Sequence, residues 1–168
     1  MDSAYIMPFV KSVQNVFEMM LQLPVTVQSP QIKRSPNPGH DVSGIIGLSG
    51  DVVGTVVLAF PNETAERVVT LFCGQKLDVD SPDFADAVGE LVNMVSGGAK
   101  ALFKDRKCSI SCPSVVVGGN HSVSVPSDTV TVMIPCDTDC GPLTLEVSIR
   151  KLEPANPTAS GATAAARA

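Results

Sequence analysis

The chain has 168 residues, of which 44% are hydrophobic and 17% are charged, a composition typical of a globular protein that folds as one domain. The formal net charge of −5 and the lack of any long run of Lys or Arg exclude the usual nucleic-acid-binding surfaces. No stretch reaches the roughly 18 apolar residues of a membrane-spanning helix, and the N-terminus does not have the form of a signal peptide. We therefore expect a cytoplasmic protein without a nucleic-acid or membrane partner.

An amphipathic helix is predicted over residues 4–23, because apolar side chains recur there at helical spacing and Pro24 ends the pattern. These apolar residues are Ile6, Phe9, Val10, Val13, Val16, Phe17, Met20 and Leu21. Residues 24–40 contain four prolines and short β-like pieces, which predicts an edge strand followed by a loop.

Residues 41–60, DVSGIIGLSGDVVGTVVLAF, predict two strands joined by a tight hairpin turn centred on Gly50. A short second helix follows, with Asn62 as its predicted N-cap and Gly74 at its end. A long third helix is predicted to begin after the N-cap Ser81. This third helix should run to about residue 103.

The β-branched content rises from Lys107 onward, which predicts three or four antiparallel strands. The segments concerned are CSISCPSVVVGG, HSVSVP, DTVTVMIPC and GPLTLEVSIRKL. Together the elements predict an α+β fold, an antiparallel β-sheet with two long helices and one shorter helix packed on it. We expect residues 1–153 to form this single domain. Residues 154–168 contain no large apolar side chain and are expected to be a disordered tail.

The five cysteines suggest a four-thiolate metal site at first sight, since Cys108 and Cys112, and likewise Cys136 and Cys140, are four residues apart. The first pair lies on a predicted strand, where four residues span roughly 13 Å, too far for two ligands of one zinc ion. An odd number of cysteines in a cytoplasmic chain instead favours reduced, mostly buried thiols. We therefore expect no metal in this chain.

Two small basic clusters and two histidines have simple interpretations. Lys33–Arg34 and Lys104–Lys107 are expected to be solvated surface. His40 and His121 occur in loops rich in glycine or proline and are expected to be exposed.

The third helix divides into a core face and a solvent face when residues are placed at about 100° intervals. The predicted core residues are Phe84, Val88, Leu91, Val92, Val95, Ala99 and Leu102. The opposite face carries Asp86, Glu90, Asn93, Gly97 and Lys100.

Two glycines inside this helix need a reason, because each costs the helix roughly 1 kcal/mol relative to alanine. Gly97 lies on the solvent face, where it would leave the surface flat enough for the backbone of another protein. Gly98 lies nearer the core, and we expect it to allow close packing on the sheet. The neighbouring Glu90 and Asn93 then form a polar pair beside a flat surface.

The order of three segments resembles the CheX family of chemotaxis phosphatases, relatives of CheC and FliY. These segments are YIMPFVKSVQNVFEMML, GHDVSGIIGLSGDVVGTVVLAF and DAVGELVNMVSGGAKALF, and the similarity covers roughly residues 4–150. Its most specific part is Glu90 and Asn93 followed by Gly97 and Lys100. CheC-type relatives carry a second Glu-x-x-Asn pair on the N-terminal helix, which here offers only Glu18-Met-Met-Leu, so the single-site CheX type fits better.

The resemblance implies dephosphorylation of the response regulator CheY, with Glu90 and Asn93 as the active pair. Asn93 would position the attacking water, and Glu90 would dock on a lysine of the receiver domain of CheY. We expect Asp86, Gly97 and Lys100 to contact the same partner. No cofactor would bind to this chain, and the Mg²⁺ would belong to the phosphorylated receiver.

The resemblance also implies a homodimer, and an unpaired strand edge near residues 24–35 or 108–124 would allow a shared sheet. Two other functions remain open at this point. The same helix face could bind a receiver or a flagellar switch component without catalysis, and the cysteines could serve a metal sensor. Sequence alone does not separate positioning for catalysis from positioning for binding.

Overall fold

The computed structural model describes residues 3–34, 40–104, 106–126 and 128–151. Within these ranges the chain forms three helices, α1 (Ser3–Leu21), α2 (Asn62–Cys73) and α3 (Pro82–Leu102). The strands in these ranges are β1 (Thr26–Val27), β2 (Gln31–Ile32), β3 (Val42–Gly50), β4 (Val52–Phe60), β5 (Cys108–Ile110), β6 (Ser114–Val117), β7 (Thr131–Thr138) and β8 (Gly141–Lys151). The α+β prediction is confirmed, whereas the predicted tail 154–168 lies outside the described residues.

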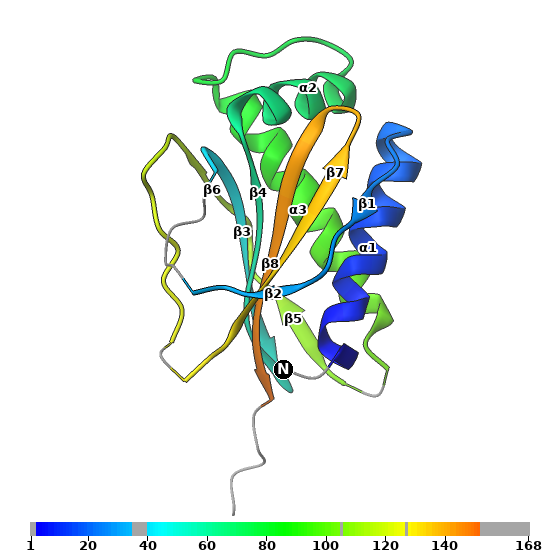
Figure 1. Cartoon of the computed structure of the whole chain (residues 1–168), viewed down its shortest axis with the longest axis vertical. Coiled ribbons are helices and arrows are strands. Elements are labelled where there is room, and N and C mark those ends of the chain that lie inside the picture. The colour runs from blue at the N-terminus through cyan, green and yellow to red at the C-terminus, as the bar shows by residue number, and fades with distance from the viewer. Residues whose placement is uncertain (1–2, 35–39, 105, 127, 152–168) are drawn as a thin grey trace, which may run out of the picture.

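The eight strands form one antiparallel sheet in the order β1-β7-β8-β4-β3-β5 (Figure 1). The hairpin predicted around Gly50 is confirmed, with β3 and β4 paired from Val42 and Phe60 to Leu48 and Gly54. β2 pairs with β7, and β6 pairs with β3. The two segments predicted to hold strand edges therefore do lie at the two edges of the sheet.

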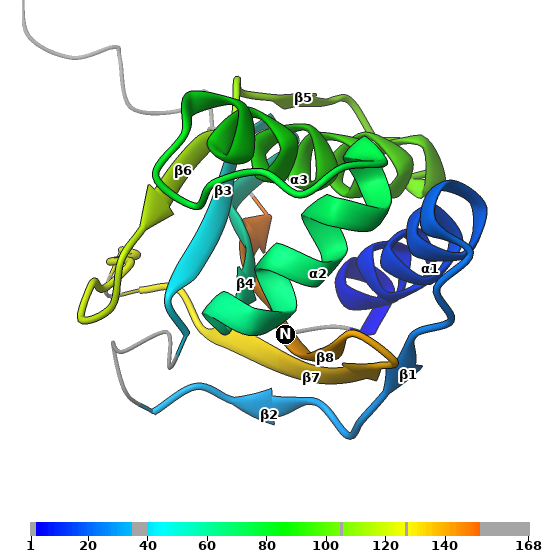
Figure 2. The ribbon, with the colours of Figure 1, turned by 90° about the horizontal axis from the view of Figure 1, so that it is seen from above.

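The helices cover one face of this sheet, with α1 beside α3 and α2 across one end (Figures 1 and 2). Gly44 of β3 faces α3, since a β-carbon there would lie 2.9 Å from the Val92 side chain. Residues two apart along a strand share its side, so the same face carries the strongly buried apolar side chains of both hairpin strands. These are Val42, Ile46, Leu48, Val56, Leu58 and Phe60, each at most 4% exposed.

The ends of the helices follow the sequence with one correction. Ser81 caps α3 as predicted, because its side chain accepts a hydrogen bond from the Phe84 N–H at 3.2 Å. Gly74 ends α2 with φ of 71°, a left-handed conformation that favours glycine. Asn62 is not the N-cap of α2 but its first residue, and its own N–H donates to the carboxylate of Asp41 at 3.3 Å. The Asp41 side chain therefore satisfies a backbone N–H at the start of α2.

Three predicted features of the chain differ in the structure. The segment HSVSVP, residues 121–126, forms no strand, because it belongs to the connection that crosses from β6 at one edge of the sheet to β7 near the other. Leu102 is 43% exposed and Met20 is 50% exposed. Both lie in the last turn of their helices.

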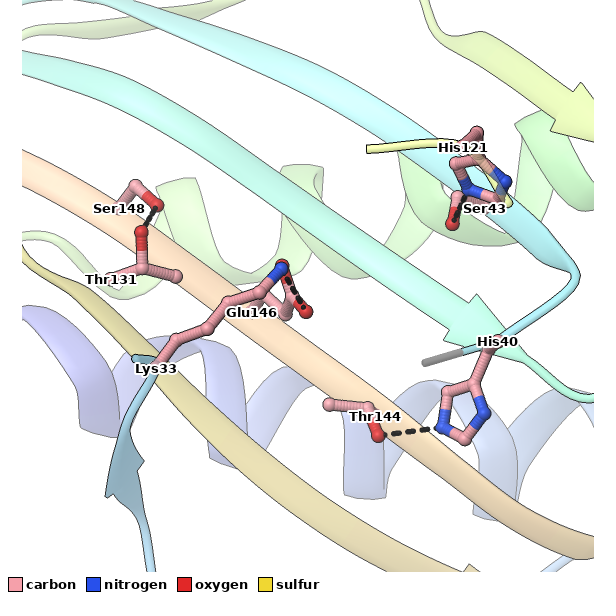
Figure 3. Close-up of polar contacts among 8 residues, drawn as sticks. All are labelled: Lys33, His40, Ser43, His121, Thr131, Thr144, Glu146 and Ser148. Atoms are coloured by element: carbon pink, nitrogen blue, oxygen red, sulfur yellow. Dashed lines mark hydrogen bonds and ion pairs between the residues drawn. The ribbon is translucent and has the colours of Figure 1, made fainter. Parts of the chain in front are cut away.

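The face of the sheet away from the helices carries several buried polar side chains beside apolar ones such as Val57 (Figure 3). Lys33 donates to both carboxylate oxygens of Glu146 at 2.8 and 2.7 Å, and their side chains are 9% and 3% exposed. The expectation of solvated surface is therefore wrong for Lys33. Lys33 follows β2 directly, and its backbone N–H donates to the Thr131 carbonyl of β7 at 3.0 Å, which fixes the residue beside the buried carboxylate.

The histidines are also more ordered than expected. His40 Nε2 lies 2.8 Å from the Thr144 hydroxyl, and His121 Nε2 lies 2.8 Å from the Ser43 hydroxyl (Figure 3). Both histidines are half-buried. Each connects a loop to a hydroxyl on the sheet, so the prediction of simply exposed loop histidines is wrong.

Candidate active site

Helix α3 presents the five predicted site residues on the side opposite its buried face. Asp86, Glu90 and Lys100 are exposed, while Asn93 and Gly97 are half-buried. Six of the seven predicted core residues are at most 1% exposed, and these are Phe84, Val88, Leu91, Val92, Val95 and Ala99. The structure thus places the predicted site residues together on one accessible helix face.

The side chains of Glu90 and Asn93 have no hydrogen-bond or ion-pair partner within the described part of the chain. They follow each other by one helical turn, since residues three apart are neighbours on a helix surface. Their carboxylate and carboxamide are therefore available to another molecule. Gly97 adds an open surface beside them, because a β-carbon there would meet nothing within 4 Å.

The segment that carries Glu90 and Asn93 is held by close contacts on three sides. Below it, Gly44 of β3 accommodates the Val92 side chain. On one flank, a β-carbon at Gly89 would lie 3.4 Å from the ring of Pro113, just before β6. On the other flank, Gly98 meets α1. The helix is thus seated against the sheet, the edge strand and α1 at once.

The contact of Gly98 corrects the expectation that this residue packs on the sheet. A β-carbon at residue 98 would lie 2.3 Å from the hydroxyl oxygen of Ser12, on α1. That hydroxyl donates to the carbonyl of Val95 at 2.7 Å. Sequence reasoning assigned no role to Ser12 or Pro113, and the only signal was the small size of the glycines that face them.

The cysteines do not form a cluster in the structure. All five are free thiols, with Cys73 and Cys112 exposed and the other three buried. Burial raises the pKa of the Cys136 thiol to about 12, and the nearby charge of Asp137 adds to this effect. In the residues that the structure describes, no group of three His, Cys, Asp or Glu side chains could hold a metal ion. No described helix is long and apolar enough to cross a membrane.

The family model of the chemotaxis phosphatase CheX matches residues 42–137 of this sequence, which include Glu90 and Asn93. The chain belongs to the CheX family. Among known proteins, it is 25% identical over 138 residues to the CheY-P phosphatase CheX of Thermotoga maritima, a similarity that spans 80% of this chain and 88% of the relative.

Solved structures confirm the CheC-like fold. A CheC-like protein from Shewanella sp. PV-4 is 30% identical with a TM-score of 0.80, covering 89% of this chain and 99% of the other. The CheX of the CheX-CheY-BeF₃-Mg²⁺ complex from Borrelia burgdorferi is 24% identical with a TM-score of 0.73, covering 88% and 98%. The family model establishes the CheX family for this chain, and the solved structures establish its fold.

Proposed function

We propose that this member of the CheX family hydrolyses the aspartyl phosphate of a CheY-type receiver domain through the exposed face of α3. The observation that carries the proposal is the pair Glu90 and Asn93, which is accessible and unpaired within the described residues on a helix seated from three sides. Membership of the CheX family and the named CheY-P phosphatase activity of the Thermotoga relative support the choice of substrate.

Asn93 is the proposed catalytic residue. An aspartyl phosphate is already a reactive mixed anhydride, so its hydrolysis needs a water molecule held in line with the departing carboxylate. The carboxamide can accept one hydrogen bond from this water and donate another to it, as a positioning glutamine does in GTPases. The water oxygen forms a bond to phosphorus while the bond from phosphorus to the aspartate oxygen breaks, which releases inorganic phosphate and restores the carboxylate.

Glu90 is the proposed docking residue. Its negative charge would repel the phosphoryl group, so direct contact between the Glu90 carboxylate and the transferred phosphate is unfavourable. A carboxylate one turn before Asn93 can instead pair with a lysine of the receiver. Asp86, Gly97 and Lys100 lie on the same face and would complete the contact, with Gly97 allowing the partner's backbone to approach.

The metal ion of the reaction would come with the partner. No described group of side chains in this chain could hold a cation, and the Borrelia complex combines a CheX with CheY, BeF₃ and Mg²⁺. We therefore place Mg²⁺ in the receiver, where it would neutralise the phosphate oxygens while Asn93 holds the water.

A homodimer is a further part of the proposal. β2 and the β5–β6 segment lie at opposite edges of the sheet, and an unpaired edge can add a strand from a second copy. Light scattering should give a mass near two chains at micromolar concentration. A mass near one chain would contradict the dimer but not the phosphatase activity.

The function is tested by following the lifetime of a phosphorylated receiver with Mg²⁺ present. This protein should shorten that lifetime when it is present in amounts far below the receiver, because a catalyst turns over. A receiver whose phosphate decays no faster, although the two proteins bind, would show a binding module instead.

A further inference from the structure

The edge strand beside α3 is interrupted between β5 and β6 at residues 111–113. The interruption is fixed to β3, since the Ser111 N–H donates to the Gly47 carbonyl at 2.9 Å and the Gly47 N–H donates to the Ser111 hydroxyl at 2.9 Å. Ser111, Cys112 and Pro113 are all exposed. These three residues, which we call the edge break, therefore form a defined and accessible piece of surface. Irregularities in edge strands occur often beside active sites.

Two contacts place the edge break along α3. Near its start, the helix meets the edge at Gly89, which lies against Pro113. Near its end, Lys100 is close enough to Cys108 for its charge to oppose the burial that raises the pKa of that thiol. The edge and α3 thus run antiparallel, and Figure 2 shows β6 on the side of α3 away from α1.

The residue level with Asn93 follows from this register. One helical turn from Gly89 to Asn93 advances about 6 Å, which equals roughly two strand residues. Gly89 lies against Pro113 and Val115. Two strand residues back from the middle of this contact is Cys112. The edge break is therefore the part of the edge that lies beside Asn93.

We infer that the edge break is the second wall of the receiver-docking surface, contacting the receiver next to its phosphorylated aspartate. This inference rests on the proposed function of α3. A specific protein interface covers roughly 800 Å² on each partner, more than five side chains of one helix offer. The edge break is exposed, lies level with Asn93 by this register, and has its backbone already held in place by β3.

A bulky label on Cys112 tests the inference. Cys73→Ser leaves Cys112 as the one exposed thiol of the chain. The three buried thiols have pKa values raised by burial, so they stay protonated and react slowly with fluorescein maleimide. The matched control is Cys73→Ser/Cys112→Ser/Asp139→Cys, which carries the label at an exposed residue of the turn between β7 and β8, away from α3 and from both edges proposed for the dimer.

Binding is measured with a receiver held in its active form by beryllofluoride and Mg²⁺, so that docking is read without hydrolysis. Labelling Cys112 should weaken binding at least tenfold, while the label at residue 139 should leave affinity within twofold. Equal affinity of the Cys112-labelled and unlabelled proteins would overturn the inference, as would a loss of binding that comes with a changed oligomeric mass. An unlabelled protein that does not bind the receiver at all would instead refute the proposed function.

Discussion

Ser12 and Gly98 meet so closely that the hydroxyl oxygen of Ser12 occupies the space beside the missing β-carbon of Gly98, 2.3 Å from where that carbon would be. This contact joins α1 to α3 about one and a half turns beyond the proposed catalytic residue. It explains why α3 keeps a glycine at residue 98 although alanine favours helix formation. The adjacent Gly97 has open space instead, so the two glycines serve different purposes.

The two glycines therefore predict opposite effects on stability. Gly98→Ala should lower the free energy of unfolding by about 1 to 3 kcal/mol, because either the Ser12 hydroxyl gives up its hydrogen bond to Val95 or α1 and α3 move apart. Gly97→Ala should raise it by up to about 1 kcal/mol through helix propensity. Urea denaturation measures both changes.

Ser12→Ala provides the matching control for the first of these variants. Without its hydroxyl, the nearest remaining atom of residue 12 is its β-carbon, 3.4 Å from the β-carbon of an alanine at residue 98. Adding Ser12→Ala should therefore restore most of the stability lost by Gly98→Ala. Additive losses in the double variant would show that the contact is not the cause.

The buried ion pair on the far face of the sheet leads to a second prediction. Lys33→Met leaves the carboxylate of Glu146 buried without its partner, and Glu146→Leu leaves the ammonium group of Lys33 in the same state. Each single change should cost about 3 to 5 kcal/mol of stability, whereas the double variant should cost less than either. Chemical denaturation of the three variants checks this. A double variant as unstable as the sum of the two would contradict the account.

The thiols predict a dependence of stability on alkaline pH. Burial raises the pKa of Cys136 to about 12 from an ordinary value of 9.0. Between these values the unfolded chain releases the thiol proton while the folded chain keeps it, so the folded state loses stability as pH rises from about 9 towards 12. Cys136→Val should reduce this loss, measured as the unfolding free energy at pH 8 and pH 10. An unchanged slope would contradict the prediction.

Reactivity towards a thiol reagent tests the same burial. In the native protein at pH 8, two cysteines should react quickly, since Cys73 and Cys112 are exposed. The other three should react only after denaturation, because they are buried and stay protonated. If all five cysteines reacted quickly in the native protein, the core would have to open readily.

Much of the fold follows from local patterns in the sequence. The hairpin at Gly50, the cap at Ser81 and the buried face of α3 depend on turn chemistry and on side chains a few residues apart. The sequence also indicates which residues share the exposed face of α3. Periodicity within one helix is sufficient for that.

The parts that sequence missed depend on residues far apart in the chain. Lys33 and its partner Glu146 are separated by 113 residues. Ser12 and its partner Val95 are separated by 83 residues. No local pattern reports such pairs. The segment HSVSVP has strand-like alternation, but its place between opposite edges of the sheet prevents it from forming a strand, because topology overrides propensity.

The proposed roles of the two active residues predict different kinetics. Glu90→Gln keeps the shape of the side chain but removes its charge, so it should weaken both binding and turnover. The advantage of the unchanged protein should shrink as salt concentration rises, because exposed charges are screened. The measurement is receiver affinity and phosphate decay at low and high salt. An affinity that does not depend on the Glu90 charge at low salt would contradict the docking role.

Stability controls keep these kinetics interpretable. Glu90 is exposed and Asn93 is half-buried, so changes at either residue should alter the unfolding free energy by about 0.5 kcal/mol or less. Val92 is fully buried one position away, and Val92→Asp should destabilise the domain strongly by burying an unpaired charge. Thermal melts of the three variants make this comparison. A large loss of stability at Asn93 would point to a structural role.

The most direct test of the account is the decay rate of receiver phosphate with Asn93→Ala at catalytic amounts. If Asn93 positions the attacking water as the reaction proceeds, turnover should fall by about 10²-fold or more while affinity for the beryllofluoride-activated receiver stays nearly unchanged. An Asn93→Ala protein that melts normally and still turns over at the unchanged rate would contradict the catalytic role of Asn93.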